Sequence, residues 1–268
     1  MQLNHVGLIG YGEVGKTFAL GLLEKSGVVS VAAWDLKLSS DAPLSVRQAE
    51  LAHAKTHGIQ ATDSMAALCV KCQFIISAVT ASNTLAVAQE AAKYLQPGTV
   101  FLDLNSASPG TKQACAQLIE AAGGLYVEAG VMTSVPPYGI RVPMLLGGTS
   151  SKALADKLQS WGLDAKSVSD TLGVASAIKM SRSVMIKGLE ALVIESYATA
   201  RAYGVEDHVL PTLQETFPQI DWAQQGAYFF SRVVQHGKRR SEEMREAANT
   251  EKEAGFEPFM AMATADKQ

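Results

Sequence analysis

The chain has 268 residues, 47% of them hydrophobic, and a formal net charge of −3. This length allows one large domain or two ordinary domains with a sizeable buried core. The near-neutral charge, with no long run of one sign, excludes a nucleic-acid-binding surface and a basic membrane-binding patch. No apolar stretch is long enough for a membrane helix and no secretory leader precedes the first predicted strand, so we expect a cytoplasmic protein with small-molecule partners.

The cysteines are Cys69, Cys72 and Cys115, an odd number that is too small for a disulfide framework. Cys69 and Cys72 form a CxxC pair, but no second ligand pair is spaced to complete a metal site. We therefore predict buried thiols and no metal site.

The N-terminal segment has the pattern of a dinucleotide-binding fingerprint. An apolar strand over 3–9 leads into Gly10-Tyr11-Gly12-Glu13-Val14-Gly15, which opens a helix predicted over 13–25. The glycines allow a tight turn, the approach of a pyrophosphate and close packing of helix on strand. A second strand, 28–35, ends in Asp35, about twenty residues further on, where the fold places an acid for the ribose. We predict that these seven residues bind the cofactor, the alternative being a glycine-rich turn without a ligand.

Asp35 also indicates which dinucleotide is bound. A carboxylate there hydrogen-bonds the free 2′-hydroxyl of NAD and repels the 2′-phosphate of NADP. NAD is therefore favoured, and Lys37, two residues on, leaves NADP as the alternative.

The next predicted elements are a helix over 45–57, a short strand at 59–60, a helix capped by Asp63, a strand over 74–79, a helix over 82–95 and a strand over 99–104. Pro109 begins a further helix. Ligands in an open parallel sheet lie at the carboxyl ends of the strands. We therefore expect the cofactor to contact Ala78, Val79, Thr80 and Asn105. The alternative for Asn105 and Ser106 is that they only cap the next helix.

Two strands, 125–128 and 142–146, flank a segment over 129–138 that is rich in glycine, serine and proline. A segment of this kind between strands more often builds a site than a simple turn. A helix over 150–161 and a last strand over 165–168 complete the first domain.

The longest helical pattern runs from 172 to 204 without a proline, with Lys179 near its start. Arg182 and Ser183 follow at three and four residues, on the same face, where they could meet a ligand between two domains. Strands and helices alternate before this helix and only helices follow it. We predict a Rossmann-type doubly wound α/β domain (1–168) and an all-α domain (169–268) joined by a long interdomain helix.

Helices are predicted over 207–217, 221–235 and 238–249, with a tail from 255 and Pro211 in the first turn or so of the first. The segment 236–245 mixes bases and acids, which favours a solvated helix with pairs Arg239–Glu243 and Glu242–Arg245. The alternative is that one of its bases binds a carboxylate.

These motifs together resemble the β-hydroxyacid dehydrogenase family, which includes 3-hydroxyisobutyrate and 6-phosphogluconate dehydrogenases. The resemblance covers the whole chain through GLIGYGEVG, DLNSASP at 103–109, YVEAGV at 126–131 and G-x-x-x-x-x-K ending at Lys179. IKMSRSVMIKGLEAL and HGKRRSEEMREA are similar to the branch with a phosphogluconate-dehydrogenase-like C-terminal domain.

The resemblance implies that Lys179 is the general acid and base that exchanges a proton with the substrate oxygen while a hydride moves to or from the nicotinamide. A lysine at an apolar helix start, near other cations, can have a lowered pKa that suits this role. Without the resemblance, Lys179 would be interpreted as an exposed lysine on a helix surface.

Several residues depart from the family pattern. Ser183 replaces an asparagine, Met132-Thr133-Ser134 replaces S-G-G, and Gly130 replaces a proline. Ile186 stands where 6-phosphogluconate dehydrogenases carry a glutamate, so we do not expect 6-phosphogluconate as substrate. Arg182 is a candidate carboxylate fork. The residues predicted to contact substrate are Ser106, Val131, Met132, Thr133, Arg182, Ser183, Lys238 and Arg240.

We therefore predict an NAD(P)-dependent dehydrogenase that oxidises a 3-hydroxy acid or 3-hydroxy amino acid to the 3-keto compound. A ketone or imine reductase of the same fold is the first alternative, although imine reductases resembling this family usually replace the lysine. A non-catalytic NAD-binding sensor is the second, and it need not keep Lys179. By analogy with the family, apolar residues of the C-terminal helices predict a homodimer.

Overall fold

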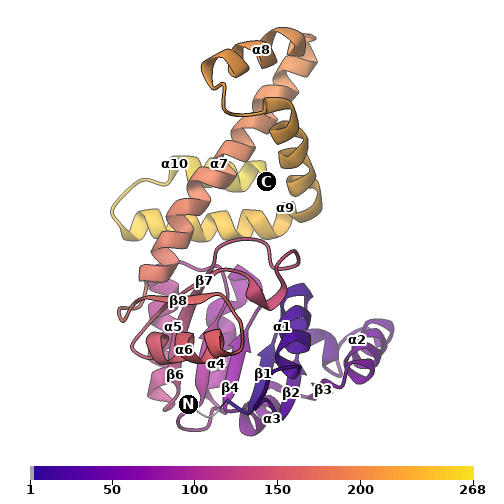
Figure 1. Ribbon diagram of the computed structural model, residues 1–268, viewed down its shortest axis with the longest axis vertical. Helices are drawn as coiled ribbons and strands as arrows, with labels where there is room; N and C mark the ends of the chain where they lie inside the picture. Colours follow the sequence, from indigo (N-terminus) through magenta and orange to yellow (C-terminus); the bar gives the residue numbers. More distant parts are fainter. Residues whose placement is uncertain (1–2) are drawn as a thin grey trace. The chain divides into compact units, whose positions relative to one another are not determined.

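The computed structural model describes residues 3–268, which form two compact units, Met1–Lys179 and Met180–Gln268 (Figure 1). The division falls within one helix, α7 (Val174–Tyr203), immediately after the lysine singled out above. The domain boundary predicted after residue 168 lies within the first unit, shortly before α7 begins.

The first unit is built on one eight-stranded sheet with the strand order β3-β2-β1-β4-β5-β6-β7-β8. The first six strands are parallel, β7 is antiparallel to β6, and β8 is parallel to β7. This arrangement, followed by helices only, confirms the predicted fold class. The strands are β1 (His5–Ile9), β2 (Ser30–Trp34), β3 (Gln60–Ala61), β4 (Phe74–Ser77), β5 (Val100–Asp103), β6 (Leu125–Val131), β7 (Met144–Gly147) and β8 (Ala165–Ser169).

Helices cover both faces of this sheet, because the central strands are apolar on both sides. Alternate residues of β4 show the division: Phe74 and Ile76 join the cluster with α1, α2 and α6, and Ile75 joins the cluster with α3, α4 and α5. The helices are α1 (Glu13–Leu23), α2 (Leu44–Thr56), α3 (Met65–Lys71), α4 (Thr84–Ala92), α5 (Pro109–Ala121) and α6 (Ser151–Ser160), with short 3-10 turns at Leu36–Leu38, Ala81–Asn83 and Gly139–Arg141.

Two local predictions in this unit are wrong. Ser64, not Asp63, caps α3, since its side chain accepts a hydrogen bond from the backbone N–H of Ala67 at 3.1 Å. Residues 129–131 belong to β6 rather than to the following loop, because they pair with β7. Pairing between distant segments, which local composition does not report, extends the strand.

All three cysteines are free and buried, as predicted for Cys69 and Cys72. Burial is the largest cause that raises the pKa of the Cys69 thiol to about 12 and that of Cys72 to about 11. Both groups are therefore protonated near neutral pH and behave as apolar core side chains.

The second unit contains the rest of α7 with α8 (Glu206–Thr216), α9 (Trp222–Glu253) and α10 (Phe259–Lys267). Its core consists of two small clusters. One joins Met180 of α7 to Met244 of α9 and Ala261 of α10, and the other joins Val193 of α7 to Trp222 and Phe229 of α9.

Two predictions in this unit are also wrong. The segments 221–235 and 238–249 form one helix, α9, which changes direction near its middle (Figure 1). Gly237 is near the middle of this helix in the sequence, and glycine both weakens a helix and allows it to bend. Pro211 lies inside α8, not in its first turn.

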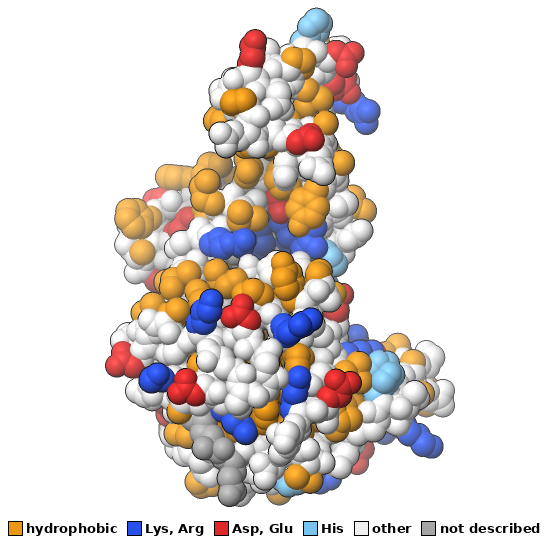
Figure 2. All heavy atoms as spheres, in the orientation of Figure 1, with side chains coloured by type: hydrophobic (Ala, Val, Ile, Leu, Met, Phe, Trp, Pro, Cys, Tyr) orange, Lys and Arg blue, Asp and Glu red, His pale blue; other side chains and the backbone are white. Residues whose placement is uncertain are grey.

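Hydrophobic side chains remain on the surface of this unit, over α7 and α10 (Figure 2). Met185 and Leu192 of α7 are 72% and 60% exposed, and Phe259 of α10 is 77% exposed. Within residues 3–268, no helix combines the length and hydrophobicity needed to cross a membrane.

Candidate functional site

The fingerprint loop has the geometry that a dinucleotide requires. Gly10 has a φ of 94°, a conformation that favours glycine, and a side chain there would collide with the carbonyl of Ala78, directly after β4. A Cβ at Gly12 would meet nothing within 4 Å, so there is open space at the point where α1 begins. No side chain caps this helix N-terminus, which leaves it suited to receive a phosphate.

Asp35 links the loop to the end of β2. One carboxylate oxygen accepts the backbone N–H of Tyr11 at 2.6 Å and the other accepts that of Lys37 at 2.9 Å. Because a carboxylate offers about four lone-pair sites, both oxygens can still accept ribose hydroxyls. The residues present therefore fit NAD, and Asp35 also fixes the loop that would hold its pyrophosphate.

Tyr11 takes a role that the motif alone does not reveal. Its side chain is fully buried and its hydroxyl lies 3.1 Å from Nδ1 of His53 on α2. Burial first, and then Glu50, raise the pKa of Tyr11 to about 12, while burial lowers the pKa of His53. The Tyr11 side chain is thus engaged inside the protein, which leaves its backbone for the predicted cofactor contact. Glu13 is exposed and Val14 is half-buried at the start of α1.

The ends of β4 and β5 are tied together by Asn105. Its Oδ1 accepts the backbone N–H of Val79 at 2.7 Å, and its Nδ2 donates to the hydroxyl of Ser77 at 2.9 Å. Both side-chain groups of Asn105 are thus engaged within the protein, and the residue is only 3% exposed. Ala78, Val79 and Thr80 continue from this brace and are more accessible, with Thr80 exposed.

Lys179 and Ser106, chosen separately from the sequence, lie together. The Lys179 Nζ donates a hydrogen bond of 2.5 Å to the Ser106 hydroxyl, although the residues are 73 positions apart. Ser106 follows β5 at its carboxyl end and Lys179 lies in the second turn of α7. An amine and a hydroxyl therefore meet at the edge of the sheet where ligands bind in this type of fold.

A buried ion pair supports this edge. Lys112 of α5 and Asp103 of β5 are each 1% exposed, with Nζ 3.0 Å from Oδ1. The remaining bonds of the Asp103 carboxylate come from the Asn105 backbone N–H at 2.8 Å and the Tyr126 hydroxyl at 2.6 Å. Burial, followed by Asp103, holds the pKa of Tyr126 well above its usual value. The segment that carries Asn105 and Ser106 is thus anchored to a satisfied polar network.

Glu128 of β6 is a second buried carboxylate at this edge. It accepts hydrogen bonds from the first turn of α7, at the backbone N–H groups of Gly173 and Ala175 and at the Ser176 hydroxyl. Sequence reasoning missed Asp103, Lys112 and Glu128. The available signal was a charged residue inside an otherwise apolar strand or helix face, where an unpaired charge is rare.

The other predicted substrate residues fall into two groups. Val131 ends β6, and the half-buried Met132 and exposed Thr133 follow it in the first unit. The remaining four belong to the second unit: Arg182 and Lys238 are exposed, Ser183 is 9% exposed and Arg240 is 5% exposed.

Arg240 is engaged inside the second unit. Its guanidinium pairs with Glu190 of α7, and its Nε donates to the Gln268 side chain at 2.9 Å. Nearby, Lys187 pairs with Glu243, and burial lowers the pKa of Lys187. The predicted pair Arg239–Glu243 is present at 3.8 Å, while Arg245 pairs with Asp266.

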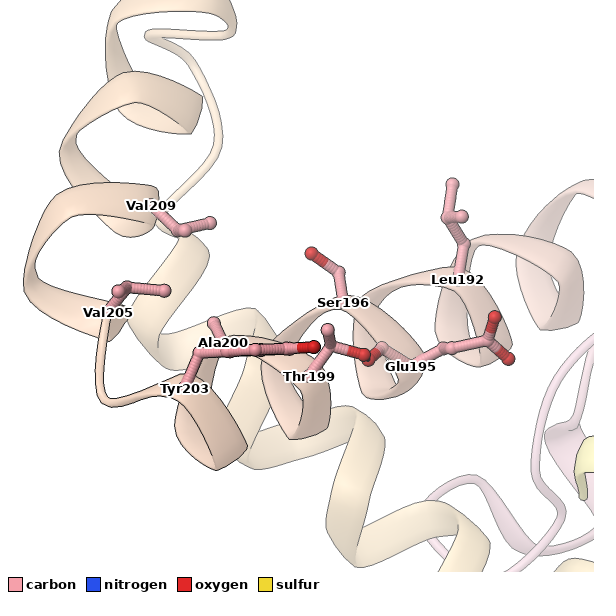
Figure 3. A pocket seen from close by; sticks show the side chains of 8 residues that line it. All are labelled: Leu192, Glu195, Ser196, Thr199, Ala200, Tyr203, Val205 and Val209. Atoms are coloured by element: carbon pink, nitrogen blue, oxygen red, sulfur yellow. The ribbon is translucent and has the colours of Figure 1, made fainter.

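An open groove of about 360 Å³ lies between α7 and α8 (Figure 3). None of its lining residues is among the predicted site residues. It is lined by Leu192, Glu195, Ser196, Thr199, Ala200, Tyr203, Val205 and Val209.

The fold and the fingerprint define the first unit as an NAD(P)-binding domain of an oxidoreductase. The chain belongs to the family of the NAD binding domain of 6-phosphogluconate dehydrogenase, whose model matches residues 5–154. Residues 200–268 match a second model, described as a domain of unknown function (DUF1932).

Solved structures agree with this assignment. A conserved hypothetical protein from Sinorhizobium meliloti 1021 is 38% identical, over 100% of this chain and 87% of that chain, with a TM-score of 0.76. The conserved protein MTH1747, of unknown function and described as structurally similar to 3-hydroxyacid dehydrogenases, is 31% identical over 98% and 96%, with a TM-score of 0.72.

The fold also extends to a more distant enzyme. A 3-hydroxyisobutyrate dehydrogenase from Mycobacterium tuberculosis is 14% identical over 98% of this chain and 92% of that chain, with a TM-score of 0.73. At this identity the likeness shows the fold alone. Together the comparisons confirm the predicted resemblance to the β-hydroxyacid dehydrogenases.

Proposed function

We propose that this protein is an NAD(P)-dependent dehydrogenase that oxidises a 3-hydroxy acid or a 3-hydroxy amino acid to the 3-keto compound. The observation that carries the proposal is the contact of the Lys179 amine with the Ser106 hydroxyl at the carboxyl end of β5. An amine held at this edge, in a domain that binds a nicotinamide cofactor, supplies the proton acceptor that alcohol oxidation needs.

In the proposed reaction, the neutral amine of Lys179 takes the proton of the substrate hydroxyl and becomes an ammonium group. The bound nicotinamide supplies the hydride acceptor. Ser106 holds the Lys179 side chain in place through the 2.5 Å hydrogen bond and so fixes the point at which the proton is exchanged. In the reverse direction the ammonium group returns the proton to the carbonyl oxygen.

We assign substrate contacts to Val131, Met132 and Thr133, with Arg182 as the fork for the substrate carboxylate. A guanidinium matches a carboxylate through two parallel hydrogen bonds. Arg182 and Lys238 are the exposed bases among the predicted substrate residues of the second unit. Ser183 follows Arg182 on α7 and completes the proposed set. We leave Arg240 out because its guanidinium is engaged with Glu190.

We also propose that NAD is the preferred cofactor and that Asn105 acts on it indirectly, by fixing the Val79 backbone. The preference rests on Asp35, whose carboxylate lies at the end of β2 and disfavours a 2′-phosphate. The free thiols support the cytoplasmic location predicted from the sequence.

We further propose that the protein is a homodimer. Exposed apolar residues of α7 and α10, including Met185 and Phe259, would be buried by a second copy of the chain. The proposed partner surface belongs to the helical unit.

The test is formation of reduced nicotinamide by the wild type and Lys179→Ala, with NAD and NADP, across a panel of 3-hydroxy acids and 3-hydroxy amino acids. We expect kcat to fall about 10²- to 10⁴-fold in the variant, the usual contribution of a general acid or base, with NAD binding retained. Lys166→Ala is the matched control, because that lysine side chain is 70% exposed on β8.

Two outcomes would contradict the proposal. Full activity of Lys179→Ala would exclude this lysine as the proton acceptor. Tight NAD binding without turnover of any hydroxy acid would favour either a ketone or imine reductase or a non-catalytic cofactor sensor. Assays in the reductive direction with ketones and imines would then distinguish these two.

A further inference from the structure

The first turn of α7 rests on one side chain of β6. Glu128 is 0% exposed, and all its described hydrogen-bond partners lie at the start of this helix. Its Oε1 accepts the backbone N–H groups of Gly173 at 2.7 Å and Ala175 at 3.1 Å, and its Oε2 accepts the Ser176 hydroxyl. The carboxylate thus satisfies backbone donors that a helix start leaves without an intrahelical partner.

Two glycines leave room for this arrangement. Gly147 of β7 pairs with Glu128 in the antiparallel ladder, and a side chain at Gly147 would occupy the place of the carboxylate. Gly130, two residues after Glu128, lies on the same face of β6. A Cβ there would lie 2.9 Å from the Ala175 carbonyl oxygen and 3.3 Å from the Lys179 Cβ. The helix therefore approaches β6 closely at the turn that carries the lysine.

From these contacts we infer that Glu128 is a positioning residue for the proton transfer, which fixes the first turn of α7 on β6 and so directs the Lys179 amine to Ser106. The inference rests on the proposed role of Lys179. Gly130 and Gly147 contribute to the same arrangement. The absence of a side chain at Gly130 lets α7 approach β6, and its absence at Gly147 leaves space for the Glu128 carboxylate.

A carboxylate suits this position better than a neutral group. The N-terminus of a helix carries a partial positive charge that a buried anion compensates. Hydrogen bonds to a charged acceptor are also roughly twice as strong as those between neutral groups, so the turn is held more firmly. Lys179 lies only three residues beyond Ser176, and a shift of the first turn therefore moves its amine relative to Ser106.

The kinetic test compares Glu128→Asp, Glu128→Gln and the matched control Glu120→Gln, which removes an exposed carboxylate from α5. Aspartate keeps the charge but retracts it, and a displacement of about 1 Å can cost on the order of 10²-fold in rate, so we expect that loss in kcat. Glutamine keeps the length and should lose less, about tenfold. KM for NAD should not change in any variant, because two strands, β4 and β5, separate β6 from β1, which leads into the fingerprint.

The pH dependence gives a readout that a merely structural role would not move. Loss of the negative charge in Glu128→Gln disfavours the ammonium form of Lys179 and so lowers its pKa. In the plot of kcat against pH, the rise that follows deprotonation of Lys179 should therefore move to lower pH. Glu120→Gln should leave it in place. Unchanged kcat and an unchanged limb in Glu128→Gln, with only a lower melting temperature, would overturn the inference.

A second measurement does not depend on turnover and separates this inference from the proposed function. The lysines are reductively methylated with a ¹³C label, and the Lys179 resonance is identified by its absence in Lys179→Ala. We expect its titration to shift to lower pH in Glu128→Gln even if no hydroxy acid is oxidised. Identical titrations in the wild type and Glu128→Gln would refute the positioning role.

Gly130→Ala provides the complementary variant if Glu128 variants fold poorly. It leaves every hydrogen bond of Glu128 in place but inserts a methyl group against Ala175 and Lys179. We expect the same separation, a lower kcat with unchanged KM for NAD. Wild-type kcat in a folded Gly130→Ala protein would show that the close approach of α7 is not required.

Discussion

The two units treat their buried charges differently. In the sheet unit, Asp103 and Lys112 share one network with the backbone of β5, the Asn105 N–H and the Tyr126 hydroxyl. In the helical unit, the described ion-pair partners of the buried Lys187 and Arg240 are glutamates on the neighbouring helix. The sheet unit therefore holds these polar groups through fixed backbone as well as side chains, and the helical unit holds its ion pairs through side chains of neighbouring helices.

This difference suits different tasks. A large core and fixed backbone partners should hold the Lys179–Ser106 pair in a defined geometry, which the proposed acid-base chemistry requires. The helical unit has two small apolar clusters, so a substitution there should disturb less of a shared core. We therefore expect substitutions to be more costly in the first unit, and the following predictions test that ranking.

Lys112→Met should have the largest effect on stability. It leaves the Asp103 carboxylate buried without its cation, which typically costs about 3–5 kcal/mol of unfolding free energy. Denaturant unfolding measures this loss, with Lys152→Met, at an exposed lysine of α6, as the control. A loss below about 1 kcal/mol would show that the remaining donors to Asp103 suffice without the ion pair.

Arg240→Met should cost less, about 2 kcal/mol. The usual loss for a broken buried pair is reduced here because Lys187 lies one helical turn from Glu190 and can take the place of the guanidinium. Hydrogen exchange should increase first in α9 and α10. An equal or greater loss than in Lys112→Met would reverse the proposed ranking of the two units.

Met185→Glu tests the exposed apolar surface of the helical unit. In the proposed homodimer, a charge at this 72% exposed position should weaken association about tenfold or more, equivalent to about 1.4 kcal/mol. Sedimentation velocity measures the dimer fraction, with Val29→Glu, at a 68% exposed position of the sheet unit, as the control. If the wild type is a monomer, the homodimer proposal is wrong. If Met185→Glu and Val29→Glu weaken association equally, the interface is not specific to the helical unit.

The sequence predicted the features that depend on neighbouring residues. GxGxxG after a strand, Asp35 after the next strand and the long helix with Lys179 each have a local pattern, and each lies where that pattern placed it. Ser106 and Lys179 were both chosen, but no local pattern showed that their side chains meet.

The features that were missed depend on pairing between distant segments. Glu128 lies 45 residues before Gly173, its first described partner, and Asp103 receives a hydrogen bond from Tyr126 on the neighbouring strand. The sequence shows that these carboxylates are present but not which donors form hydrogen bonds with them. The continuity of α9 through Gly237 was missed for a related reason, since tertiary packing outweighs the weak helix propensity of glycine.

The division of the chain immediately after Lys179 has a consequence for recombination. A crossover at this point keeps the fingerprint, Asp35, Ser106, Glu128 and the lysine in one parental sequence. Arg182, Ser183 and Lys238 all come from the other parent. If the proposed substrate contacts are correct, exchange of residues 180–268 between relatives should change substrate selectivity and leave the proposed acid-base residue and its supports unchanged.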